Sequence, residues 1–155
     1  MNIKQVKIGL WIFVFVTLAA HAGTWGPGSF DNDDALDWLQ NDFESDGAAA
    51  IEGAVNAVAR SRSSDYIDAP LASRAVAACE FLAAWQGRPS KDIPDPILAE
   101  AKILRGAPRE ALRERARKAL DRVVKDSELQ ALWAEGNEPE YEQWKKAMAD
   151  LRARL

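Results

Sequence analysis

The chain has 155 residues, of which 24 are acidic and 20 are lysine or arginine, so its formal net charge at pH 7 is −4. This length is enough for one domain of ordinary size with a hydrophobic core. Because mildly acidic proteins bind nucleic acid and anionic membrane surfaces poorly, we expect neither as a partner.

The first 22 residues have the pattern of a secretory signal peptide. Residues 1–7 contain two lysines and no acid, an uncharged apolar run covers Ile8 to Ala20, and the sequence Ala-His-Ala ends the segment. The apolar run is shorter than the roughly 20 residues that a membrane-spanning helix needs. We therefore predict cleavage between Ala22 and Gly23, a periplasmic or secreted product, and no stable membrane insertion. The alternative is an uncleaved anchor.

Cleavage would restrict the chemistry that the mature chain can perform. It would remove His21, the only histidine, and would leave Cys79 as the only cysteine. A chain without histidine has no Ser–His or Cys–His pair and no histidine-ligated zinc site. Cys79 lies in the most apolar segment, so we interpret it as a packing thiol. We predict no cofactor and no catalytic residues, and the chain is not expected to be an enzyme.

The remaining sequence, residues 23–155, predicts a single all-α domain of about six to seven helices preceded by a glycine-rich N-terminal arm. Alternating β-branched residues are absent, alanine is common, and proline and glycine fall where helices should begin and end. In chain order the expected helices cover about 33–43, 48–60, 70–86, 95–105 and 108–125, then a short helix capped by Ser127 with Gln130, and a last helix that begins at Pro139.

Two of these helices carry more detailed predictions. The helix over 70–86 is the most apolar, so it should be the central, buried helix, with Asp68 as a candidate N-cap. In the first helix, Leu36, Leu39 and Phe43 are expected to share the face that contacts the core.

The stretch GTWGPGSFDNDDALDW, from Gly23 to Trp38, is the most distinctive part of the sequence. Its glycines and proline predict an irregular arm. Trp25 and Phe30 are the large apolar side chains of that arm, and we expect them to anchor it against the helices. Either Asp31 or Asn32 should cap the first helix.

Four aspartates in this stretch exceed what one helix cap requires; they are Asp31, Asp33, Asp34 and Asp37. Three interpretations stay open. The acids could favour the helix dipole, they could form an acidic surface for a partner, or Asp31, Asp33 and Asp37 could bind a cation. The pattern of a calcium loop fails early, because Ala35 stands where an oxygen ligand is needed and no glycine follows it.

The same stretch resembles the opening of an uncharacterised bacterial family, domain of unknown function 4259. Its members typically begin with Gly-x-Trp-Gly-x-Gly-x-Phe-x-Asn-Asp followed by an Asp-Trp pair, and the later SELQALW and DLRARL also look like the family pattern. The resemblance implies a shared fold and no established activity. Many relatives start at the motif, so export would be a departure. The matching positions are Gly23, Trp25, Gly26, Gly28, Phe30, Asn32, Asp33, Asp37 and Trp38.

Charges are segregated along the chain. The stretch from Asp31 to Glu52 has eight acids, and no base follows before Arg60, whereas the helix over 109–125 is rich in arginine and lysine. A basic helix can bind phosphates, but this one has no interleaved aromatic residues and contains ordinary i,i+4 ion pairs, which favours a solvated face. Alternatively, the basic helix meets the acidic stretch, either within the fold or in an antiparallel dimer.

From these observations we expect an exported, non-catalytic interaction module of the cell envelope, whose partner is another envelope protein or a second copy of the chain. One alternative is a cation-binding protein that uses the carboxylates from Asp31 to Asp37. A less favoured alternative is a glycan hydrolase that depends on two carboxylates. The expected contact residues are Trp25, Phe30, Asp31, Asp33, Asp34, Asp37 and Trp38.

Overall fold

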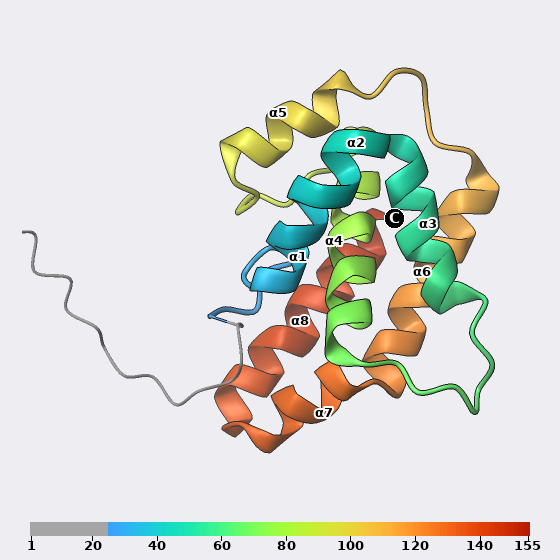
Figure 1. Ribbon diagram of the computed structural model, residues 1–155. Coiled ribbons are helices and arrows are strands. Elements are labelled where there is room, and N and C mark those ends of the chain that lie inside the picture. The colour runs from blue at the N-terminus through green and yellow to red at the C-terminus, as the bar shows by residue number, and fades with distance from the viewer. Residues whose placement is uncertain (1–24) are drawn as a thin grey trace, which may run out of the picture.

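The computed structural model describes residues 25–155, so the predicted signal peptide and its cleavage site lie outside the described residues. Within this part the chain forms helices joined by loops and no strand, which confirms the all-α prediction (Figure 1). No helix in the described part is long and apolar enough to cross a bilayer. The elements are α1 (Asp33–Trp38), the π-helix η1 (Leu39–Phe43), α2 (Glu44–Asp46), α3 (Ala48–Ala59), α4 (Ala69–Trp85), α5 (Asp95–Ile103), α6 (Glu110–Lys125), α7 (Glu128–Glu135) and α8 (Glu138–Arg154).

The helix boundaries follow local capping signals. Asp68 caps α4, since its Oδ1 accepts a hydrogen bond from Leu71 N at 2.8 Å. Ser127 caps α7 by accepting from Gln130 N at 3.1 Å. The side-chain amide of Gln130, through Nε2, donates to the Tyr141 hydroxyl at 2.8 Å. It is not bound to the backbone N–H of Ser127, so only half of the predicted capping box forms. The helix predicted over 95–105 ends two residues early, at Ile103.

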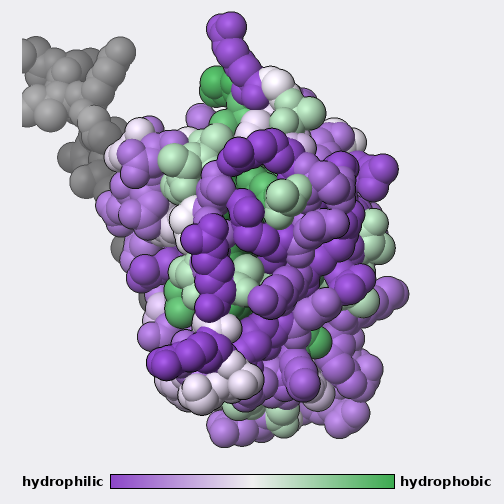
Figure 2. All heavy atoms as spheres, turned by 90° about the vertical axis from the view of Figure 1, so that its right-hand side faces the viewer, coloured by the Kyte–Doolittle hydropathy of each residue, from purple (hydrophilic) through white to green (hydrophobic). Residues whose placement is uncertain are grey.

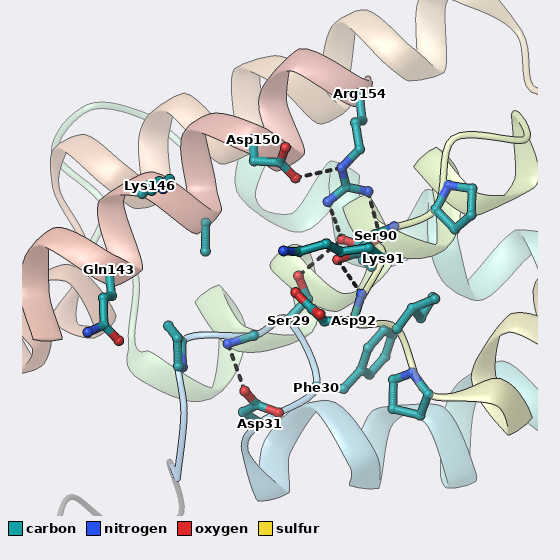
Figure 3. A pocket seen from close by; sticks show the side chains of 17 residues that line it. Ser29, Phe30, Asp31, Ser90, Lys91, Asp92, Gln143, Lys146, Asp150 and Arg154 are labelled. Atoms are coloured by element: carbon teal, nitrogen blue, oxygen red, sulfur yellow. Dashed lines mark hydrogen bonds and ion pairs between the residues drawn. The ribbon is translucent and has the colours of Figure 1, made fainter.

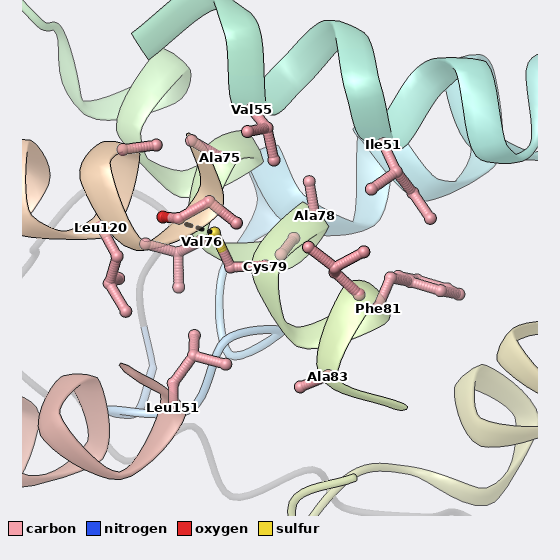
Figure 4. Packing of buried hydrophobic residues seen from close by; sticks show 14 of the residues in the cluster. Ile51, Val55, Ala75, Val76, Ala78, Cys79, Phe81, Ala83, Leu120 and Leu151 are labelled. Atoms are coloured by element: carbon pink, nitrogen blue, oxygen red, sulfur yellow. Dashed lines mark hydrogen bonds between the residues drawn. The ribbon is translucent and has the colours of Figure 1, made fainter. Parts of the chain in front are cut away.

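Helix α4 is the centre of the fold. It lies among the other helices in Figure 1 and contacts α1, α3, α5, α6, α7 and α8. Figure 4 shows Val55 of α3 and Leu120 of α6 packed around it. Cys79 of α4 is fully buried, its thiol lies 3.6 Å from the Ala116 carbonyl oxygen of α6, and burial raises its pKa well above the ordinary value. The predicted central helix and packing thiol are both confirmed.

The core-facing side of the first helical run differs from the prediction. Phe43 is buried and Leu39 is partly buried against the core, as predicted, whereas Leu36 is 37% exposed and Ala35 and Trp38 are buried instead. The run passes from α1 into the π-helix, whose wider turn brings residues five positions apart to the same side. Both rings thus reach Phe81 of α4, with centroid distances of 5.9 Å from Trp38 and 4.2 Å from Phe43.

Candidate functional site

The N-terminal arm, Trp25 to Asn32, folds around the Asp31 side chain. Asp31 Oδ2 accepts a hydrogen bond from Gly28 N at 2.9 Å, and the Asp31 carbonyl accepts one from Trp25 N at 2.9 Å. A Cβ atom added at Gly26 or Gly28 would collide with this carboxylate, so a larger residue at either position would displace the Asp31 side chain from its place in the arm. The cap of α1 is Asn32, whose Oδ1 accepts from Ala35 N at 2.8 Å, so Asp31 closes the arm and does not cap the helix.

The aromatic residues predicted for the contact surface divide into two groups. Phe30 and Trp38 are 6% and 3% exposed, and both rings pack against Phe81, with Phe30 edge-on at 5.6 Å. Their burial places both rings in the core, out of reach of a partner that docks on this surface. Trp25 is 58% exposed, so the expectation that it anchors the arm is wrong. Its main chain is held by Asp31 while its indole faces solvent.

The helical run that follows the arm carries an unpaired acidic surface. We call residues 31–46 the acidic segment; it contains no lysine or arginine. Asp33 and Asp37 are exposed, and Asp34 is half-buried. Within residues 25–155, none of the seven carboxylates of this segment forms an ion pair. The seven are Asp31, Asp33, Asp34, Asp37, Asp42, Glu44 and Asp46.

The carboxyl group of Asp34, within this segment, has a raised pKa. Partial burial is the largest cause of a raised pKa for its carboxyl group. The nearby negative charges of Asp37, Asp33 and Asp68 raise the pKa further, while Arg74 opposes them. The charged form of Asp34 is therefore less favourable in the folded protein than in an unfolded chain.

The proposed cation ligands do not converge. In the described part of the chain, no group of three or more histidine, cysteine, aspartate or glutamate side chains could hold a metal ion. The carboxylate of Asp31 is directed to Gly28 N, whereas Asp33 and Asp37 are exposed on α1. In this structure, Asp31, Asp33 and Asp37 do not form a cation site.

Among the described residues, the acidic stretch from Asp31 to Glu52 forms ion pairs with the basic helix α6 and its N-cap through one acid, Glu52. Glu52 of α3 accepts Arg115 Nη2 at 2.7 Å and Arg109 Nη2 at 3.3 Å. Other α6 arginines pair within their own helix or just beyond it, Arg117 with Glu110 at 3.2 Å and Arg122 with Asp126 at 2.6 Å. Much of the basic charge of α6 is therefore used inside the fold, in line with the internal alternative.

A buried ion pair that the sequence analysis missed lies where four parts of the chain meet. Glu80 of α4 is 2% exposed and binds Arg154 of α8 in a bidentate pair, with both oxygen–nitrogen distances at 2.7 Å. Ser90 N, from the loop between α4 and α5, donates to Glu80 Oε1 at 2.9 Å. The Ser29 hydroxyl of the arm donates weakly to Oε2 at 3.5 Å. We call this group the Glu80 junction.

The Glu80 junction forms the floor of a pocket of about 780 Å³. The arm, the α4–α5 loop and one face of α8 form its walls (Figure 3). Asp31 therefore belongs both to the pocket wall and to the acidic segment, which places the two candidate surfaces next to each other. Elsewhere, the face shown in Figure 2 is mostly hydrophilic with small separate apolar areas, so it offers no large apolar docking surface.

The comparison with protein families identifies this fold's relatives. Residues 23–147 match a family described as "Domain of unknown function (DUF4259)", and the match begins at the first residue of the Gly-x-Trp-Gly motif. The match covers most of the chain, and the protein belongs to this family. No curated protein and no solved structure matches the chain.

Proposed function

We propose that this protein is an exported, non-catalytic interaction module of the cell envelope that binds a positively charged partner through Trp25 and the acidic segment. The observation that carries the proposal is that parts of the protein differ in how many of their charged side chains form ion pairs. Among the described residues, α6 and the Glu80 junction use most of their charges in ion pairs, whereas the seven carboxylates of the acidic segment have none.

Capping and the helix dipole account for only part of this acidity. Asp33 and Asp34 lie in the first turn of α1, where negative charge is favourable. Apart from Asp31 in the arm, the other acids extend from Asp37 at the end of α1 over η1 and α2, where the run of like charges repels itself. A basic partner would relieve that repulsion and would attract the module over the distance of a Debye length, about 8 Å at physiological ionic strength.

Trp25 supplies an apolar group beside these charges. Its main chain is fixed through the hydrogen bond to Asp31, and its indole is exposed. A tryptophan whose main chain is held before binding has only its side-chain rotamers left to order, and its indole can pack against an apolar group or over a cation. We therefore infer a partner segment that combines lysine or arginine with apolar residues, on another envelope protein or a second copy of this chain.

Export is supported by the sequence of residues 1–22 alone. It is tested by expressing the full chain and measuring the mass of the product in the envelope fraction. A product that begins at Gly23 supports export. A product that retains residues 1–22, or stays in the cytosol, contradicts it.

Binding is tested by cross-linked capture from the same fraction. Because Leu155 is buried, a C-terminal tag would disturb the fold, so biotin is attached to a cysteine introduced at exposed Ala134 on α7. The native Cys79 is buried and does not compete for the label. We expect a saturable partner with a basic surface that is recovered in proportion to the bait.

The deciding variants are one double charge change and one aromatic change. Asp33→Asn with Asp37→Asn should abolish capture, and Trp25→Ala should weaken it. The matched control, Glu114→Gln with Glu135→Gln, changes two exposed acids on α6 and α7 that form no ion pair among the described residues. Capture that survives the aspartate changes as well as it survives the control changes would refute this assignment of the surface.

A further inference from the structure

The pocket above the Glu80 junction has walls of mixed charge, and its charges are not equally paired. Its acids are Asp31, Glu80, Asp92 and Asp150, and its bases are Lys91, Lys146 and Arg154. We propose that this pocket is a binding site for a small organic anion with a carboxylate or phosphate group, held between Lys91 and Lys146. This inference goes beyond the proposed function: the two surfaces share Asp31, but the lysines that would hold the anion are not part of the acidic segment.

Three of the four pocket acids are already engaged by donors of the fold. Glu80 and Asp150 both bind Arg154, the latter through Nε at 2.8 Å. The carboxylate of Asp31 accepts the Gly28 N–H. Arg154 also donates to the carbonyl of Arg88 at 3.1 Å, so its guanidinium is largely used. The fourth acid, Asp92, lies exposed on the loop, and the hydrogen bond from Gly28 N leaves Asp31 charged, so an incoming anion would have to avoid both of these carboxylates.

The two lysines are the cations left for a ligand. Lys91 extends from the α4–α5 loop into the pocket, and Lys146 comes from α8 on the other side (Figure 3). Within residues 25–155, neither is in an ion pair. The neighbouring Lys145 differs, because it pairs with Glu142 at 2.5 Å and lies 4.6 Å above the Tyr141 ring. The fold thus pairs one of two adjacent lysines on α8 and leaves the other at the pocket.

The volume and the stiffness of the walls indicate what size of anion fits. About 780 Å³ is within the roughly 300–1,000 Å³ that is usual for small-molecule sites and far exceeds a single phosphate ion. Pro27, Pro89 and Pro94 restrict the two loop walls. The Glu80 junction joins the loop and α8, and more weakly the arm, so the backbone walls of the site exist before a ligand arrives, and binding has to order the side chains of the two exposed lysines.

Direct binding measurements test the proposal. Citrate, glycerol 3-phosphate and inorganic phosphate are titrated at constant ionic strength into the full-length protein, followed by calorimetry and by amide chemical shifts. We expect saturable binding of citrate or glycerol 3-phosphate, with shifts concentrated at residues 27–31, 89–94 and 143–154. Citrate alone would indicate a carboxylate ligand, and glycerol 3-phosphate alone a phosphate ligand; either result supports the site.

The lysine variants decide whether the pocket holds the anion. Lys91→Gln and Lys146→Gln should each weaken binding about tenfold, and the double change should abolish it. Lys118→Gln, at an exposed position of α6 that is in no ion pair among the described residues, is the matched control and should change nothing. Three results would each overturn the inference. The first is no saturable binding of either organic anion up to about 10 mM. The second is binding that the double variant retains. The third is inorganic phosphate binding as tightly as both organic anions.

Discussion

The Glu80 junction and the acidic segment use charge in opposite ways, although the arm connects them. At the junction one carboxylate is almost completely buried and receives donors from the loop and α8, with a weaker one from the arm. In the acidic segment seven carboxylates face mostly solvent and form no ion pair among the described residues. Buried charge requires such partners, because an unpaired ion in the interior costs several kcal/mol. Exposed charge does not, so it stays available for recognition.

This comparison indicates that burial, more than charge itself, distinguishes the acids that stabilise the fold from the acids that are candidates for contact with a partner. If it is correct, substitutions at the Glu80 junction should change stability strongly, whereas substitutions that neutralise the exposed aspartates and glutamates of the acidic segment should leave stability unchanged or raise it.

The largest effect is expected for Glu80→Ala. The change leaves the partly buried guanidinium of Arg154 without its main partner and frees Ser90 N, so we expect a loss of about 3 kcal/mol, the lower end for a broken buried pair because Asp150 still binds Arg154. Urea denaturation measures the loss. The double variant with Arg154→Ala should be less destabilised than the two single losses added together. Strict additivity would show that the two side chains do not act as a pair.

A smaller loss is expected for Asn32→Ala at the point where the two regions meet. The change removes the side-chain acceptor of the Ala35 N–H at the start of α1, which typically costs about 1 kcal/mol. Asn32→Ser keeps a capping oxygen and should recover most of the stability. Equal melting curves for the alanine and serine variants would mean that the cap contributes nothing.

Glu52→Gln should cost at most about 1 kcal/mol, since its ion pairs with Arg109 and Arg115 are partly exposed. The difference from the unchanged protein should shrink at 1 M salt, because screening weakens exposed pairs. A cost that persists at high salt would indicate a packing role for the side chain. Thermal melts at two salt concentrations distinguish the two outcomes.

The smallest effect, and one of opposite sign, is expected for Asp34→Asn. The pKa of Asp34 is raised in the folded protein, so its contribution to stability is present at low pH and is lost as pH rises through that raised pKa. Asparagine does not ionise, so the variant should melt up to about 3 °C higher at pH 7 and equally at pH 3. A lower melting temperature at pH 7 would show that attraction to Arg74 and to the N-terminus of α1 together outweigh burial and the neighbouring acids.

Local signals in the sequence predicted most of the fold. Asp68 and Pro70 marked the start of α4, and the apolar composition of that helix marked it as central. Periodicity failed for the first helical run, where an assumed period of 3.6 placed Leu36 in the core. The π-helix changes within one turn which side chains face the core, and no sequence pattern in residues 33–43 predicts it. Trp25 was misplaced because an aromatic residue on a glycine-rich arm is equally compatible with anchoring and exposure.

The site was harder to predict than the helices because its parts are far apart in the sequence. Glu80 and Arg154 are separated by 74 residues, and the pairing depends on how α4 and α8 pack. One signal was present. A lone glutamate in the most apolar helix requires a buried partner, and that expectation would have directed attention to an arginine elsewhere in the chain. The pocket itself, formed from three separate segments, has no counterpart in local sequence.

The central place of α4 has a consequence for how the molecule opens. Because this helix contacts α1, α3, α5, α6, α7 and α8, detachment of any one of them exposes part of its apolar surface to water. Such fluctuations should therefore be rare and collective, and the amides of residues 72–84 should exchange their hydrogens with solvent only when the whole domain unfolds. Amide hydrogen exchange at exposed helical positions, such as Gln40 to Asp42, should be faster by orders of magnitude. The exchange rate of the α4 amides should therefore report global unfolding, whereas the exposed outer turns should open locally and independently.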